Sequence, residues 1–176
     1  MKKCIYITSF ALGILFFCIY QEWLVIYWNR PSKLMATHQN NHTKQSVFIT
    51  LWKDNQWLKK GCTIMHEENE TAKLAAITTA WLLSAYDQQL LLKKITLEKA
   101  EISPSGTEGF LSFSESCFDQ EATAQEHLFL IESLLKTLQN NNISCQQIMF
   151  LAQDQPLNSL YLDFSLPWPL QGFLSF

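Results

Sequence analysis

The stretch from Leu97 to Leu138 reads LEKAEISPSGTEGFLSFSESCFDQEATAQEHLFLIESLLKTL, and it predicts a β-hairpin that leads into a long amphipathic helix. Apolar and polar residues alternate on both sides of the turn-forming segment 103–109, which contains one proline and two glycines. Thr123 and Glu126 have the spacing of a capping box, in which a hydroxyl and a carboxylate satisfy the free amides of a helix start. Leucine and isoleucine then recur at helical spacing, so the helix has one apolar face.

The flanking segments predict the rest of an α+β domain. Apolar residues in 46–52 and 57–65 indicate two strands, and those of the first strand occur on both faces, as is typical of a central strand. Residues 69–86 predict a helix with an asparagine N-cap, and 146–152 and 160–164 predict two final strands. The expected order is β-β-α-β-β-α-β-β, folded as a two-layer domain with both helices on one face of a mixed sheet.

The composition argues against nucleic acid as a partner. Besides an apolar N-terminal run, the 176-residue chain has room for one compact domain of about 130 residues. Residues 46–176 contain 8 lysines, no arginine and 15 acidic residues, which gives a net charge of −7 with histidine neutral. Phosphate binding needs clustered lysine and arginine, and the only arginine of the chain, Arg30, lies outside these residues.

Residues 1–28 predict a transmembrane signal-anchor. The uncharged run from Cys4 to Tyr20 follows two lysines, and a helix of that length spans most of the hydrocarbon core of a bilayer. Tryptophan and tyrosine at the end of the segment are typical of a membrane interface, so membrane contact is expected over residues 4–28. Large residues before any cut site favour an uncleaved anchor. The N-terminal lysines favour a single-pass protein of the inner or cytoplasmic membrane with an extracytoplasmic C-terminal domain.

Residues 29–45 are polar and lack apolar periodicity, so they predict a linker between the membrane and a domain at 46–176. His38 and His42 lie four residues apart in this linker, a spacing that could hold a metal on a helix. No carboxylate or thiol accompanies the two histidines. A solvated linker without a metal is therefore the expectation.

Three cysteines, Cys62, Cys117 and Cys145, lie in the predicted domain. An odd number allows at most one disulfide within the domain, and no C-x-x-C pattern indicates metal or redox chemistry. Free buried thiols are the favoured interpretation, while a bond from Cys62 to either of the other two stays an open alternative.

No set of residues predicts an enzyme. Ser112, His127 and Asp163 could be drawn as a catalytic triad, but no nucleophile elbow, glycine-rich phosphate loop or histidine-glutamate zinc motif accompanies them. We therefore expect a protein without catalytic residues, cofactor or metal.

Aromatic residues are the candidates for partner contact. The apolar tail after residue 169 would be exposed unless it docks on the domain, and docking is the favoured interpretation. The candidate partner-contact residues are Trp57, Trp168, Phe173 and Phe176.

Four segments, in order and at the right separations, resemble one known family. They are Gly109–Ser114, Leu134–Leu138, Ile143 followed by Ile148–Phe150, and Leu162–Pro167. Together they resemble the GerMN domain, the sporulation and spore-germination module named after the germination protein GerM, over roughly residues 47–167. The chain departs from the family in lacking the glycine-proline that commonly ends the first helix, and it carries one copy of the domain.

The resemblance implies a bacterial, membrane-tethered domain outside the cytoplasm that is similar to ring-building modules and has no catalytic residues. We therefore expect a structural or assembly role in a cell-envelope complex, through self-association or protein–protein interaction. The alternative is a module that binds a cell-wall glycan or peptide, with Trp52, Trp57 and Trp168 as stacking surfaces.

Overall fold

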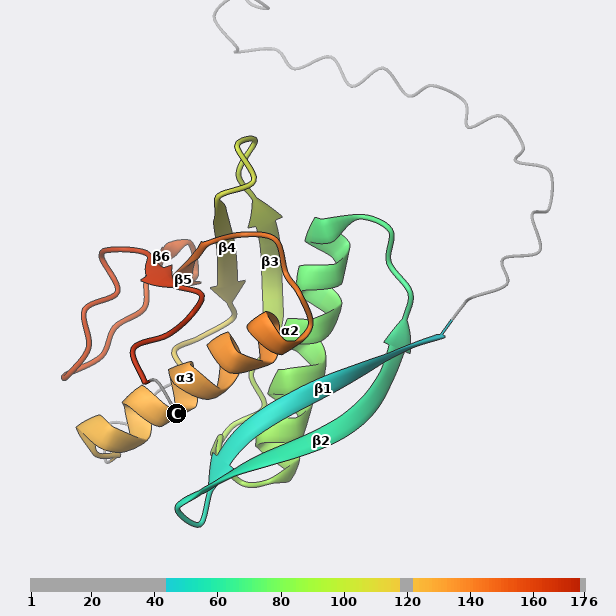
Figure 1. Ribbon diagram of the computed structural model, residues 1–176. Helices are drawn as coiled ribbons and strands as arrows, with labels where there is room; N and C mark the ends of the chain where they lie inside the picture. Colours follow the sequence, from blue (N-terminus) through green and yellow to red (C-terminus); the bar gives the residue numbers. More distant parts are fainter. Residues whose placement is uncertain (1–43, 118–121, 175–176) are drawn as a thin grey trace, which may run out of the picture. The chain divides into compact units, whose positions relative to one another are not determined.

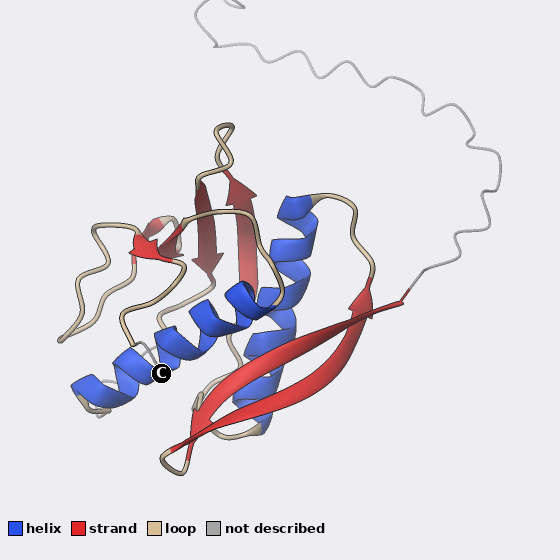
Figure 2. Ribbon diagram, viewed as in Figure 1, coloured by secondary structure: helices blue, strands red, loops and turns tan. Residues whose placement is uncertain are grey.

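The computed structural model describes residues 44–117 and 122–174, which form an α+β fold with a two-stranded sheet, a five-stranded mixed sheet and two helices (Figure 1, Figure 2). The predicted α+β class and the two predicted helices are confirmed. The first seven elements follow the predicted order β-β-α-β-β-α-β, and two short strands come after them, neither of which is the predicted strand at 160–164. The prediction of a single sheet is wrong, because the first two strands pair only with each other in the described residues.

The first hairpin consists of β1 (Lys44–Lys53) and β2 (Gln56–Met65), which pair antiparallel over their whole length. The turn residues Asp54 and Asn55 have φ values of 51° and 59°. Two successive positive φ angles are typical of a type I′ turn, whose twist matches that of paired strands. The predicted strand pair is thus confirmed, and β1 begins two residues inside the predicted linker.

The five-stranded sheet is mixed. Its strands are β3 (Leu97–Ile102), β4 (Glu108–Phe113), β5 (Gln147–Ala152), β6 (Gln155–Pro156) and β7 (Trp168–Pro169). β5 pairs parallel with β4 and antiparallel with both β6 and β7, while β3 pairs antiparallel with β4.

Helix α2 (Glu70–Asp87) connects the two sheets, because it contacts β1 and β2 as well as β3. It begins as predicted, with the Asn69 side chain accepting a hydrogen bond of 2.8 Å from the Thr71 amide. Trp81 of this helix is 1% exposed, and its indole Nε1 donates to Ser133 Oγ at 3.1 Å. Trp81 belongs to a hydrophobic core that also contains buried residues of α3 (Ala124–Asn140), β1, β4 and β5.

Helix α3 (Ala124–Asn140) begins with the predicted capping box. The Glu126 amide donates to Thr123 Oγ1 at 3.2 Å, and the Thr123 amide donates to Glu126 Oε2 at 2.7 Å. The hydrogen bonds from Thr123 hold the pKa of Glu126 below its usual value. Figure 1 shows α3 running alongside β1, and the two elements are in contact.

The prediction that β1 is a central strand is wrong. One edge of β1 pairs with β2, and the other edge is hydrogen-bonded by side chains of α3 and its C-cap. The Phe48 amide donates to Asn141 Oδ1 at 3.0 Å, and Asn141 Nδ2 donates to Phe48 O at 2.8 Å. The Thr50 amide donates to Thr137 Oγ1 at 2.9 Å, and this hydroxyl lies 3.1 Å from Thr50 O. Helix side chains therefore replace a neighbouring strand.

The predicted strand at 160–164 is wrong as well, because this segment has no strand structure. Its apolar alternation is real, but short polar side chains hydrogen-bond the local backbone. Ser159 Oγ accepts from the amides of Tyr161 and Leu162, and Asp163 Oδ1 accepts from the Ser165 amide at 2.8 Å. Such turns compete with a sheet ladder.

The predicted anchor at 1–28 and the linker up to residue 43 lie outside the described residues. Within 44–117 and 122–174, no helix is both long enough and apolar enough to cross a membrane.

Thr137→Val is expected to lower the free energy of unfolding by about 1–3 kcal/mol, because the buried Thr50 amide loses its acceptor. Thr78→Val is the matched control: Thr78 is also fully buried on a helix, but its Oγ1 has no hydrogen-bond partner in the described residues. This second variant is expected to be neutral or slightly stabilised. Denaturant unfolding of the full-length chain in detergent micelles measures both, and equal losses would contradict the role given to Thr137.

Candidate functional site

An aromatic cluster forms where the β1–β2 turn meets α3. The rings of Trp52 and Phe129 are stacked with centroids 4.3 Å apart, and the Trp57 ring meets both edge-on at 5.0 and 6.0 Å. Lys136 Nζ lies 5.1 Å from the Trp57 ring centroid. All four side chains are half-buried. We call Trp52, Trp57, Phe129 and Lys136 the aromatic cluster.

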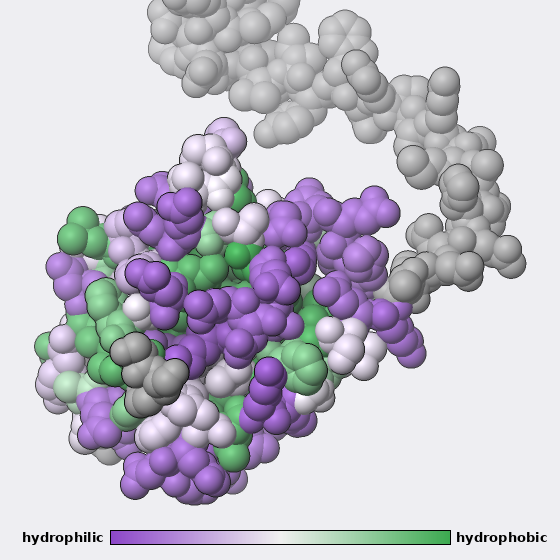
Figure 3. All heavy atoms as spheres, in the orientation of Figure 1, coloured by the Kyte–Doolittle hydropathy of each residue, from purple (hydrophilic) through white to green (hydrophobic). Residues whose placement is uncertain are grey.

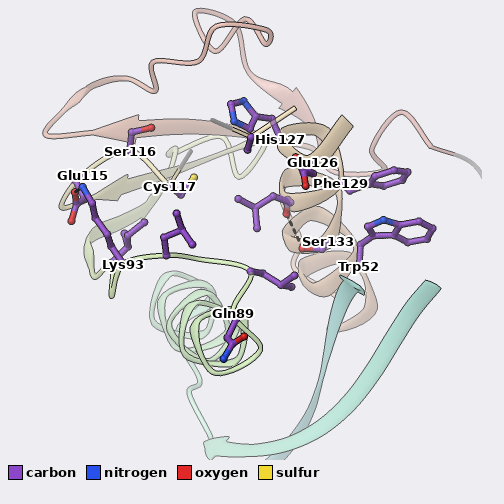
Figure 4. Close-up of a pocket in the computed structure, with 15 residues that line it drawn as sticks. Trp52, Gln89, Lys93, Glu115, Ser116, Cys117, Glu126, His127, Phe129 and Ser133 are labelled. Atoms are coloured by element: carbon purple, nitrogen blue, oxygen red, sulfur yellow. Dashed lines mark hydrogen bonds and ion pairs between the residues drawn. The ribbon is translucent and has the colours of Figure 1, made fainter. Parts of the chain in front are cut away.

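A pocket of about 620 Å³ lies beside this cluster. Figure 4 shows its lining, which comes from the first half of α3, the segment after α2, the segment after β4 and Trp52 of β1. Leu90, Ile95 and Leu130 supply apolar lining, while Lys93 and Glu115 form an ion pair of 3.1 Å at an exposed position. The lining therefore mixes apolar surface with a few polar groups, as small-molecule sites often do.

The reactive groups of the pocket are held in structural roles. Burial raises the pKa of Cys117 to about 12, so this thiol stays protonated at neutral pH. The Ser133 hydroxyl donates to Leu130 O at 2.7 Å and accepts from Trp81. His127 is 2% exposed, and its Nδ1 lies 3.0 Å from Ser159 Oγ.

The three residues that could be drawn as a triad have separate partners. His127 pairs with Ser159, Ser112 Oγ accepts from the Asp154 amide at 3.3 Å, and Asp163 accepts from Ser165. The hydrogen bonds from Ser165 lower the pKa of Asp163, which is fully exposed. In the described part of the chain, no group of three or more histidine, cysteine or acidic residues is placed to hold a metal.

Trp168, a predicted partner-contact residue, is 7% exposed and belongs to the core. Its ring stacks on Phe164 at 5.1 Å, and its Nε1 donates to Asp163 O at 3.0 Å. Phe173 is 64% exposed and meets Trp168 edge-on at 5.2 Å. Trp57 belongs to the aromatic cluster, and Phe176 lies outside the described residues.

The C-terminal tail docks on α3, as the favoured interpretation of the sequence predicted. The Phe173 amide donates to Glu132 Oε1 at 2.7 Å, and Lys136 Nζ donates to Leu174 O at 3.2 Å.

Glu132 is fully buried, and the sequence analysis missed it. The signal was present, since a carboxylate interrupts the apolar run around Ile131 and Leu134. Figure 3 shows hydrophobic side chains on the left of the molecule, over the segment that follows β6.

The three cysteines of the described residues are free. Cys117 and Cys145 are buried and Cys62 is half-buried. Burial raises the pKa of Cys62 and of Cys145 as well. The favoured interpretation of free thiols is therefore confirmed, and the alternative of a disulfide from Cys62 is not seen.

Comparisons with known proteins add little to this geometry. No family model and no curated protein matches the chain. Among solved structures, the chain is similar to that of a candidate lipoprotein from Clostridium perfringens, at 19% sequence identity over 72% of this chain and 87% of that chain. The TM-score is 0.43, and a likeness at this level carries no argument about function.

Gly172→Ala is expected to loosen the tail, whereas Gly106→Ala should leave it in place. The two glycines have nearly equal φ values, 73° and 74°, so both substitutions carry the same left-handed backbone cost of about 1–2 kcal/mol. An added Cβ at Gly172 would collide with the Glu132 carboxylate, whereas at Gly106 it meets nothing within 4 Å. Deuterium exchange of segment 170–174 in the full-length chain measures the difference, and unchanged protection in Gly172→Ala would contradict the docked tail.

Proposed function

We propose that the chain is a membrane-anchored, extracytoplasmic, GerMN-like module with a non-catalytic assembly role in a cell-envelope complex. The anchor and the orientation rest on residues 1–28 of the sequence, and the family rests on the four segments that resemble GerMN. The observation that carries the interaction role is the aromatic cluster, a half-buried group of three aromatic rings with one ammonium group.

Surfaces of this composition suit protein partners. Tryptophan and phenylalanine are enriched in the cores of protein–protein interfaces, where a few such residues supply most of the binding free energy. The stacked pair of Trp52 and Phe129 is held rigid by packing between β1 and α3, so little side-chain entropy would be lost on binding. A prepacked aromatic surface therefore supports a docking role.

The same contacts make glycan stacking the weaker candidate. A sugar needs an open ring face, but one face of Trp52 is covered by Phe129 and the Trp57 ring is approached by Lys136. Trp168, the third ring considered for stacking, is buried. The arrangement favours assembly over recognition of a cell-wall glycan.

Photo-crosslinking in cells that express the full-length chain tests this proposal. A benzophenone amino acid in place of Trp57 is expected to give discrete protein adducts, because position 57 lies in the aromatic cluster. The same amino acid in place of Tyr86, an aromatic residue on α2 that is 42% exposed, is the matched control and is expected to give few adducts.

Adducts that contain glycan but no protein would move the function to cell-wall binding. Equal adduct patterns from the two positions, or no adduct from position 57, would also contradict an assembly role for this surface.

A further inference from the structure

The two edges of the first hairpin are unequal. The edge of β1 is hydrogen-bonded by Thr137 and Asn141, but β2 is the last strand of its sheet on the other side. Because Phe48 and Thr50 direct their backbone groups away from β2, their antiparallel partners Gly61 and Lys59 direct theirs away from β1. Thr63 follows the same alternation. In the described residues, these outward groups of β2 have no hydrogen-bond partner.

This open edge is accessible. Lys59, Lys60, Gly61 and Thr63 are exposed, and a Cβ added at Gly61 would meet no atom within 4 Å. A long strand whose outer edge is exposed and unpaired offers a row of donors and acceptors to another extended chain. In β-strand addition a partner segment pairs with such an edge as a further strand, and main-chain hydrogen bonds supply the affinity.

The charge of the first hairpin indicates which kind of segment can pair with the outer edge of β2. Residues 44–65, which form the hairpin, carry four lysines and one aspartate, a net charge of +3. Residues 66–176 carry five lysines and fourteen acidic residues, a net charge of −9. A second β2 strand would bring two positive hairpins together, and like charges on neighbouring strands are destabilising. The lysines therefore oppose pairing between copies and favour an acidic segment.

We infer that the outer edge of β2 binds an extended acidic segment of a partner protein as an added β-strand. The inference deepens the proposed function and rests on its protein-interaction role, but it names a different surface from the aromatic cluster. The outward backbone groups of Lys59, Gly61 and Thr63 form the hydrogen bonds. The exposed Lys60 supplies positive charge on one face of the hairpin, and Lys59, whose Nζ lies 4.4 Å from the Phe48 ring centroid, supplies it on the other.

A fluorescent eight-residue peptide of alternating glutamate and valine, blocked at both ends, probes the edge. We expect it to bind the full-length chain in nonionic detergent micelles, as measured by fluorescence polarisation. A peptide of alternating lysine and valine should not bind. Gly61→Pro removes one outward amide and should weaken binding of the acidic peptide about tenfold or more.

Gly61→Ala is the matched control, because it keeps the amide and its Cβ has open space. It should bind the acidic peptide like the unaltered chain. Thermal unfolding of both variants establishes that they are folded, and Thr63→Pro gives a second removal of an outward amide if Gly61→Pro does not fold. The charge-reversed variant Lys59→Glu/Lys60→Glu should lose the acidic peptide and gain the basic one.

Three results would overturn the inference: no binding of the acidic peptide, equal binding by Gly61→Pro and Gly61→Ala, or a concentration-dependent dimer that Gly61→Pro abolishes. The second would indicate charge attraction without strand addition, and the third would make a second copy the occupant. If any of these results were obtained while the crosslinking test gave protein adducts from position 57, this inference would be wrong and the proposed function would still be supported.

Discussion

The hydrogen bonds between α3 and the edge of β1 are the interaction on which the rest of the structure depends. A two-stranded hairpin alone is marginally stable in water, so the first hairpin needs support from outside its own ladder. Thr137 and Asn141 supply it by giving the backbone of Phe48 and Thr50 the donors and acceptors of a missing strand. Loss of either side chain would leave backbone groups of β1 without partners, which costs more than a hydrogen bond gains.

Helix α3 thereby becomes the element that joins the parts of the domain. Phe129 in its first half stacks on Trp52 of the hairpin, and Ser133 in its middle binds the indole of α2. Glu132 and Lys136, one and two turns beyond Phe129 on the same face of the helix, hold the tail. The aromatic cluster is therefore a consequence of edge capping, because α3 must lie against β1 for the rings to meet. The open edge of β2 follows from the same arrangement, since α3 covers only the other side of the hairpin.

Local signals in the sequence predicted the helices and hairpins well. Turn residues with positive φ and the capping box of Thr123 and Glu126 act within a few residues, so their effect can be read without the fold. The apolar pattern of β1 led to the wrong prediction of a central strand. Trp52, on the second face of β1, packs against Phe129 of α3, which lies 77 positions later in the chain. The pocket and the role of Glu132 were missed for the same reason, since segments far apart in the sequence build them.

Native-state amide hydrogen exchange tests the central claim most directly, because it compares the two edges of one hairpin in one experiment. The account predicts that the amides of Phe48 and Thr50, which donate to Asn141 and Thr137, exchange as slowly as amides of the β1–β2 ladder. The outward amides of Gly61 and Thr63 should exchange near the rate of an unfolded chain. Fast exchange at Phe48 and Thr50, at the rate seen for Gly61, would contradict the claim that helix side chains complete the sheet.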